Sequence, residues 1–138
     1  NMLTHIAEQT DVLPKNYASL SDIEKIETLL TITSAISADS LTDELAKDTI
    51  ETIKAIKTIK KDNGGRACER YIISQCQSAL NAIEVFGLFL LSGWKANELA
   101  IDIVPLFETI ADLKHASRIM RELYENPVYR HHLSNRND

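Results

Sequence analysis

The chain has 138 residues and a formal net charge of −5, with 44% of its residues hydrophobic and 25% charged. This composition is that of an ordinary globular protein, and the length corresponds to one domain or part of one. An acidic chain without a basic stripe argues against a nucleic-acid partner, and the longest apolar run, residues 85–91, is far shorter than the roughly 20 residues that cross a membrane.

The first third of the chain is predicted to be helical. Ser21 and Glu24 have the spacing of a capping box, in which the serine side chain accepts a backbone N–H and the glutamate reaches back. Ser40 or Thr42 is predicted to cap the next helix, in which apolar residues recur every three or four positions. Glycines at 64–65 are expected to end that helix, because glycine tolerates the left-handed conformation found there.

A strand-helix-strand-helix pattern follows. Residues 69–74 are β-branched and aromatic, as strands are, and residues 79–91 are apolar nearly all round, which predicts a helix buried on more than one side. Residues 100–107 are predicted to form a second strand, and residues 109–124 a helix that Thr109 caps. Asp112 is interpreted as a favourable charge near the positive end of that helix. Pro127 is expected to begin a short last helix.

This order of elements predicts a helix-rich α/β fold with two parallel strands. Two strands joined by a buried helix form a βαβ unit, which implies a parallel sheet. The chain therefore divides into a helical region, residues 1–66, and a βαβα segment, residues 67–138. Because two parallel strands leave unpaired edges, we expect the sheet to continue in other sequence or to be covered by helices or partner chains.

Glu108 is the residue that best fits a catalytic or metal-binding role. It is the last of an alternating set in the second strand, after Asp102, Val104 and Leu106, and it directly precedes the helix cap. Ligands of α/β sheets bind at the carboxyl ends of strands, where a carboxylate is well placed to hold a divalent cation. The alternative is an exposed glutamate near a helix start, where the helix dipole favours it.

Other polar residues carry weaker signals. Ser74 and Gln75 end the first strand and are expected at the same edge as Glu108, although no base near Ser74 in the sequence would make it a nucleophile. His131 and His132 are predicted to be exposed, since adjacent helical histidines point in different directions. The cysteines, Cys68 and Cys76, and the lysine cluster, Lys54, Lys57, Lys60 and Lys61, are interpreted as reduced structural thiols and a solvated helix face.

Several of these segments resemble the phosphoenolpyruvate carboxylase family. Residues 102–109, Asp-Ile-Val-Pro-Leu-Phe-Glu-Thr, followed by Ala-Asp-Leu at 111–113, are similar to a strand of that family that carries Pro-Leu-Phe-Glu-Thr and leads into a helix with an Asp-Asp-Leu start. Tyr-Ile-Ile-Ser at 71–74 resembles the preceding barrel strand, Tyr-Val-Ile-Ser. The helices at 21–30 and 48–56 resemble that family's upstream helices more loosely.

The resemblance implies that residues 67–138 are part of a TIM-type barrel. It implies a lyase that adds bicarbonate to phosphoenolpyruvate, giving oxaloacetate for the tricarboxylic acid cycle and phosphate, with Mg²⁺ or Mn²⁺ as cofactor. The glutamate of the Pro-Leu-Phe-Glu-Thr string is a metal ligand in the family and corresponds to Glu108, with Ser74 and Gln75 as neighbours on the active-site face. The family also implies a cytoplasmic homotetramer as the parent enzyme.

The sequence also departs from the family. The second metal carboxylate of the family lies in a Gly-Tyr-Ser-Asp-Ser-type string, and this chain reaches Asp138 without one. The family's catalytic histidine, its substrate-binding arginines and its mobile glycine-rich loop also have no match. We therefore expect the isolated chain to be inactive and to bind metal weakly. The alternatives are a stand-alone, non-catalytic binding or assembly module and a different barrel lyase acting on a phosphorylated enol or 2-oxo acid.

Overall fold

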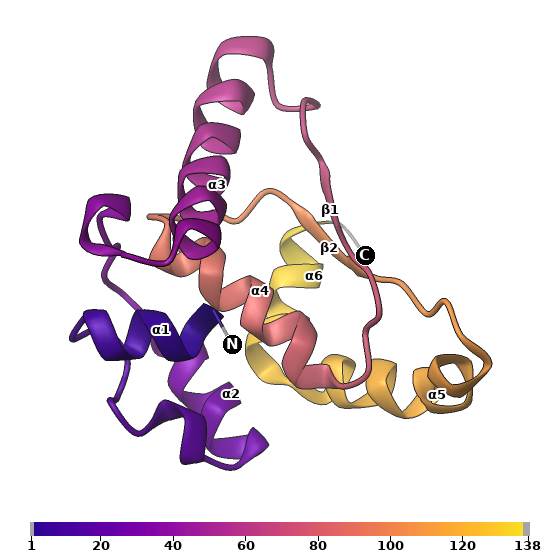
Figure 1. Cartoon of the computed structure of the whole chain (residues 1–138). Helices are drawn as coiled ribbons and strands as arrows, with labels where there is room; N and C mark the ends of the chain where they lie inside the picture. Colours follow the sequence, from indigo (N-terminus) through magenta and orange to yellow (C-terminus); the bar gives the residue numbers. More distant parts are fainter. Residues whose placement is uncertain (1, 137–138) are drawn as a thin grey trace.

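The computed structural model describes residues 2–136, and Figure 1 shows how their elements are arranged. Helix α4 lies in the middle, with α1 and α2 on one side and the two strands and α6 on the other. None of the helices in residues 2–136 is both long and apolar enough to cross a membrane. In chain order the elements are α1 (Met2–Gln9), α2 (Asp22–Leu30), α3 (Glu44–Asn63), β1 (Arg70–Ile73), α4 (Ala79–Leu91), β2 (Asp102–Pro105), α5 (Ile110–Glu125) and α6 (Pro127–Asn135).

The two strands form a parallel pair, as predicted. Arg70 of β1 lies opposite Asp102 of β2, and Ile73 lies opposite Pro105. Helix α4 makes the crossover between them, so the βαβ unit and the helix-rich α/β class are confirmed. Both strands are shorter than the sequence predicted, because each regular ladder covers four residues.

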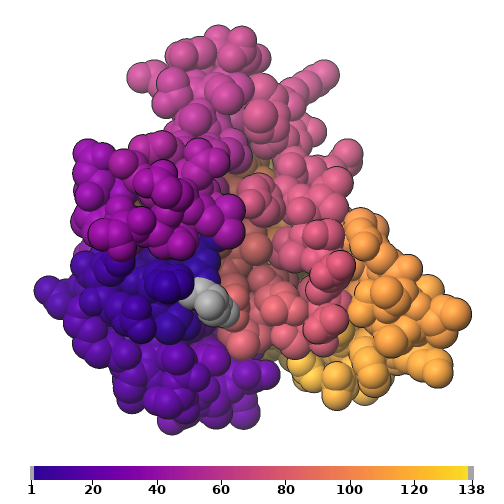
Figure 2. All heavy atoms as spheres, viewed as in Figure 1, coloured from indigo at the N-terminus to yellow at the C-terminus, as the bar shows by residue number. Residues whose placement is uncertain are grey.

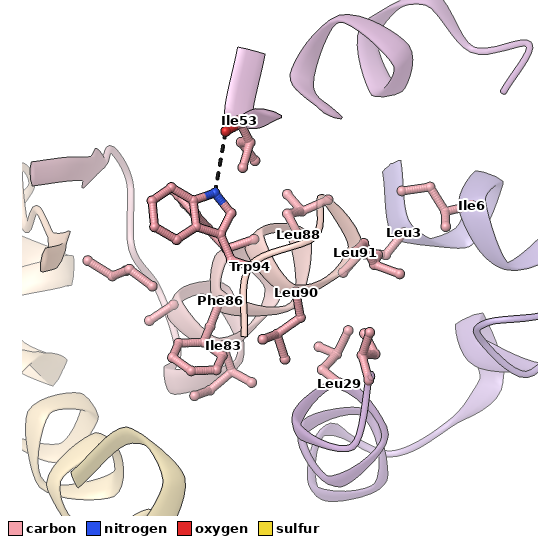
Figure 3. Packing of buried hydrophobic residues seen from close by; sticks show 14 of the residues in the cluster. Leu3, Ile6, Leu29, Ile53, Ile83, Phe86, Leu88, Leu90, Leu91 and Trp94 are labelled. Carbon is pink, nitrogen blue, oxygen red and sulfur yellow. Dashed lines mark hydrogen bonds between the residues drawn. The ribbon is translucent and has the colours of Figure 1, made fainter. Parts of the chain in front are cut away.

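Helix α4 is the centre of the hydrophobic core. Ten of its thirteen residues are buried, which confirms a helix covered on several sides. The hydrophobic cluster takes side chains from both sides of residue 66, so the two predicted regions contribute to one core. Figure 3 shows Leu29 pointing from α2 toward α4, while Trp94 donates its indole N–H to the Ile53 carbonyl of α3 at 3.4 Å.

The helix boundaries follow local capping. The Ser21 capping box is present, with the Ser21 N–H donating to Glu24 Oε2 at 2.8 Å. The prediction that Ser40 or Thr42 caps α3 was wrong, because Asp43 accepts the Ala46 N–H at 2.8 Å. Ser40 instead closes a 3₁₀ turn with its own hydroxyl. Helix α1 lies within the region predicted to be helical, but no bounds were predicted for it.

Three of the four clustered lysines of α3 donate to backbone carbonyls of neighbouring segments. Lys54 donates to the Ile36 carbonyl at 2.6 Å, and Lys57 donates to Gly93 at 3.2 Å. Lys60 donates to the carbonyl of Gly65 at 2.6 Å, across the turn that ends α3. Figure 2 shows that this end of α3 and its turn project from the rest of the molecule. The lysines thus hold connecting segments against α3, which the sequence interpretation missed.

The prediction that both adjacent histidines are exposed was wrong for His132. His131 is exposed, as predicted, but His132 is 1% exposed and neither of its ring nitrogens makes a hydrogen bond of good geometry in the described residues. The His132 ring packs edge-on against Phe86 and Tyr129, with centroids 5.6 Å and 6.1 Å away. Adjacent helical positions face different directions, and α6 turns the second of them toward α4.

Stability is expected to fall below about pH 6.5 because of His132. Burial, with Arg136 nearby, lowers the pKa of His132 below its usual 6.5, and Asp102 and the Ile101 backbone offset this only in part. The folded protein therefore takes up this proton less readily than the unfolded chain, so stability is lost as pH falls through 6.5, by at most about 1.4 kcal/mol per pH unit.

Urea denaturation between pH 5 and 7.5 checks this expectation. His132→Leu should remove most of the pH dependence in that range, and His131→Leu should leave it unchanged. Equal pH dependence of the His132→Leu variant and the wild type would contradict the assignment to His132.

Candidate metal centre

The carboxyl ends of the two strands meet at one edge of the sheet. Beyond the regular ladder, the Leu106 N–H donates to the Ile73 carbonyl at 2.8 Å, and the Cys76 N–H donates to the Leu106 carbonyl at 3.3 Å. The segments that follow β1 and β2 are therefore held side by side. This is the edge at which α/β sheets place their ligands.

Glu108 lies at this edge, in the loop between β2 and α5, and its side chain is exposed. The burial of the β2 side chains alternates only at the start of the strand, where Ile103 is buried and Val104 is half-buried, since Pro105 is half-buried too. The strand ends at Pro105, however, so the alternation that predicted the direction of Glu108 stops three residues before it. Glu108 therefore lies at the carboxyl end of β2, as the sequence predicted, but outside the regular strand.

A capping box follows Glu108 directly. The Thr109 N–H donates to Asp112 Oδ2 at 3.1 Å, and the Asp112 N–H donates to Thr109 Oγ1 at 3.0 Å. Hydrogen bonds from the Thr109 backbone, and then from its side chain, hold the pKa of the Asp112 carboxyl below its usual value. The Glu108 backbone and His115 act in the same direction, more weakly. Asp112 therefore stays ionised at neutral pH.

Ser74 and Gln75 form the turn after β1, and both are exposed. Gln75 has a φ of 53°, a left-handed conformation that reverses the chain at the end of the strand. Both residues line a hollow of about 320 Å³ together with Asn81 and other residues of α4, and Glu108 is not among the lining residues. They share the sheet edge with Glu108 but face toward α4.

No complete metal site is formed by the part of the chain that the structure describes. No group of three or more His, Cys, Asp or Glu residues there could hold an ion. Glu108 fits a divalent cation by its chemistry, since an accessible carboxylate oxygen is the ligand that Mg²⁺ prefers. One carboxylate needs further ligands, so Glu108 supplies at most one protein ligand of such a centre.

The contact between Asp112 and the loop that carries Glu108 was not predicted from the sequence. Asp112 was interpreted only as a favourable charge near the positive end of a helix. The signal was nevertheless present, because Thr109 and Asp112 have the same spacing as Ser21 and Glu24, which do form a capping box. Asp112 is 6% exposed, so its side chain faces the protein.

Comparison with known proteins gives one consistent result. The family model described as phosphoenolpyruvate carboxylase matches residues 1–138. Phosphoenolpyruvate carboxylase of Trichormus variabilis is 31% identical over 137 residues, covering 93% of this chain and 13% of the relative. The same enzyme of Prochlorococcus marinus strain MIT 9515 is 34% identical over 128 residues, covering 86% of this chain and 13% of the relative.

A third relative, phosphoenolpyruvate carboxylase of Gloeobacter violaceus, is 29% identical over 139 residues, which is 96% of this chain and 15% of the relative. The chain thus spans 13% to 15% of the length of these three relatives. No solved structure matches the chain.

Proposed function

Because this chain belongs to the phosphoenolpyruvate carboxylase family, we propose that it is a segment of an enzyme that adds bicarbonate to phosphoenolpyruvate, giving oxaloacetate and phosphate. The observation that carries the proposal is the placement of Glu108. This carboxylate stands within the string Pro-Leu-Phe-Glu-Thr, in the loop at the carboxyl end of β2. That edge of a parallel sheet is where barrel enzymes assemble their active sites.

In this proposal Glu108 is one ligand of a divalent cation, Mg²⁺ or Mn²⁺. Such a cation would neutralise the phosphate and carboxylate of the substrate and stabilise the enolate that forms when phosphate leaves. The exposed side chain of Glu108 leaves its oxygens accessible for this role. The remaining ligands and the substrate-binding groups have no counterpart in this sequence, so the isolated chain is expected to be inactive.

We further propose that β1, α4, β2 and α5 are consecutive parts of a TIM-type barrel, within the segment 67–138 that follows the helical region 1–66. The parallel pair with a helical crossover supports this arrangement. Ile72 and Leu106 are 61% and 42% exposed, and further barrel elements would cover such apolar side chains. Family resemblance extends the proposal to a cytoplasmic, homotetrameric parent that supplies oxaloacetate to the tricarboxylic acid cycle.

Binding of Mn²⁺ to the ¹⁵N-labelled chain tests the role of Glu108. Manganese broadens the NMR signals of nearby amides, so we expect selective broadening at residues 106–110. Glu108→Gln should remove that selectivity and lower the apparent affinity by at least about 10-fold, because a charged oxygen ligand is lost.

Glu98→Gln is the matched control. Glu98 is also exposed, but it precedes β2 and so lies at the opposite end of that strand. The control variant should therefore bind Mn²⁺ as the wild type does. Equal binding by the wild type and Glu108→Gln would remove Glu108 from the metal centre.

A further inference from the structure

The direction of the Glu108 side chain requires an explanation beyond the strand that precedes it. Because β2 ends at Pro105, residues 106–109 are outside the regular ladder, and the pleat of the strand does not orient Glu108. A carboxylate in a loop without such support would sample several directions. A metal ligand has to be held within about half an ångström of its productive position.

Asp112 provides that support from the first turn of α5. The N–H of Thr109 belongs to the peptide bond that follows Glu108, and it donates to Asp112 Oδ2 at 3.1 Å. The peptide unit that follows Glu108 is thus turned toward the Asp112 carboxylate, which restricts the backbone dihedral ψ of Glu108.

The Asp112 carboxylate is itself fixed. The Asp112 N–H donates to Thr109 Oγ1 at 3.0 Å, and the Leu113 N–H donates to the Thr109 carbonyl at 3.0 Å, so the turn is closed from both sides. With 6% of its surface exposed, Asp112 faces the backbone rather than the solvent. Glu108 and Asp112 are both acidic and four residues apart, but only Glu108 presents its carboxylate to the outside.

We propose that Asp112 is a positioning residue, which fixes the loop so that the Glu108 carboxylate is presented toward a cation at the carboxyl end of β2. The inference rests on the proposed role of Glu108 as a metal ligand. Groups that orient metal ligands through hydrogen bonds are as much a part of a metal site as the ligands themselves, and their loss costs about 10- to 100-fold in affinity.

The competing explanation is that Asp112 only caps α5, and the chain contains a matched control for it. The capping box of α2 has the same design: the Ser21 N–H donates to Glu24 Oε2 at 2.8 Å, and the Glu24 N–H donates to Ser21 Oγ at 3.3 Å. The α2 box has no proposed metal ligand beside it. Removing the Asp112 carboxylate should disturb the start of α5, and removing the Glu24 carboxylate should disturb the start of α2. Only the removal at Asp112 should change metal binding.

The experiment measures Mn²⁺ affinity from amide broadening at residues 106–110 in the wild type, Asp112→Ala, Asp112→Asn, Glu24→Ala and Glu108→Gln. We expect Asp112→Ala to weaken binding by about 10-fold or more, with Asp112→Asn intermediate, because its neutral amide oxygen is a weaker acceptor. Glu24→Ala should bind as the wild type does. The amide spectrum and circular dichroism establish whether each variant is folded. If Asp112→Ala does not fold, the comparison is made with Asp112→Asn.

The outcomes separate the two proposals. If Glu108→Gln loses the selective broadening while folded Asp112 variants bind as Glu24→Ala does, the positioning role is wrong and the role of Glu108 stands. If Glu108→Gln binds as the wild type does, the proposed metal ligand is wrong, and the inference about Asp112 falls with it.

Discussion

Replacing Phe89 with alanine is expected to lower the free energy of unfolding by about 3 to 5 kcal/mol, which is the usual cost of removing a buried aromatic ring. The side chain is fully buried, with 0% of its surface exposed. A domain of this kind is stable by about 5 to 15 kcal/mol in total. The variant should therefore lose a large part of its stability, which urea denaturation followed by circular dichroism measures.

The reason for this large effect is that Phe89 joins α4 to two other parts of the fold. Its ring packs edge-on against Tyr71 of β1, with centroids 5.4 Å apart, and against Trp94, with centroids 5.9 Å apart. Edge-to-face aromatic pairs contribute about 0.5 to 1.5 kcal/mol each beyond burial of their area. Loss of the ring leaves a cavity between α4 and the sheet, so the position of β1 should also become less well defined.

Leu45→Ala is the control for Phe89→Ala. Leu45 lies in α3 with 67% of its surface exposed, so its truncation should change stability by no more than about 0.5 kcal/mol. If the two substitutions cost the same, α4 does not pack against the sheet through the Phe89 ring.

Much of the fold could be predicted from the sequence because its signals are local. The Ser21 and Thr109 capping patterns, the all-round apolar character of residues 79–91 and the β-branched run at 69–74 each depend on residues within a few positions of one another. The parallel pairing followed from the order of these elements. These features were predicted because neighbouring residues determine them.

The features that were missed depend on contacts between distant parts of the chain. Lys54 and Lys57 contact carbonyls 18 and 36 residues away, which no local pattern indicates. His132 is buried because α6 lies against α4, where its ring meets Phe86. An adjacent pair of histidines looks the same in sequence whether or not a neighbouring helix covers one of them.

For the candidate site, the sequence predicted the position of Glu108 but not what orients it. The alternation expected to orient Glu108 requires a strand that continues to residue 107, whereas β2 ends at Pro105. The capping box over Thr109 and Asp112 was visible as a pattern, but its contact with the Glu108 loop requires the geometry of the turn. Residue type and spacing located the candidate residue, whereas the hydrogen bonds of the turn that follows it depend on the folded backbone.

Replacing Gly87 with valine is expected to destabilise the fold by about 2 to 3 kcal/mol, because α2 packs closely against α4 at this glycine. A Cβ at this position would lie 2.9 Å from Leu29 Cδ2 and 3.4 Å from Leu29 Cβ. Leu29 is fully buried, so moving its side chain would disturb the core around it. Valine is a better helix former than glycine, which stabilises the variant by less than about 1 kcal/mol. The measured loss of stability is therefore the cost of overpacking minus this gain.

Gly65→Val is the control for this overpacking, since no atom lies within 4 Å of a Cβ at Gly65 and its φ is not in the left-handed range. That variant should stay within about 0.5 kcal/mol of the wild type in urea denaturation. A double-mutant cycle then tests the contact itself. Leu29→Ala removes the side chain that the introduced valine would meet, so the double variant should be more stable than the sum of the two single losses, by up to about 3 kcal/mol. Additive losses would mean that Gly87 and Leu29 do not touch, and that the packing of α2 on α4 differs from the structure.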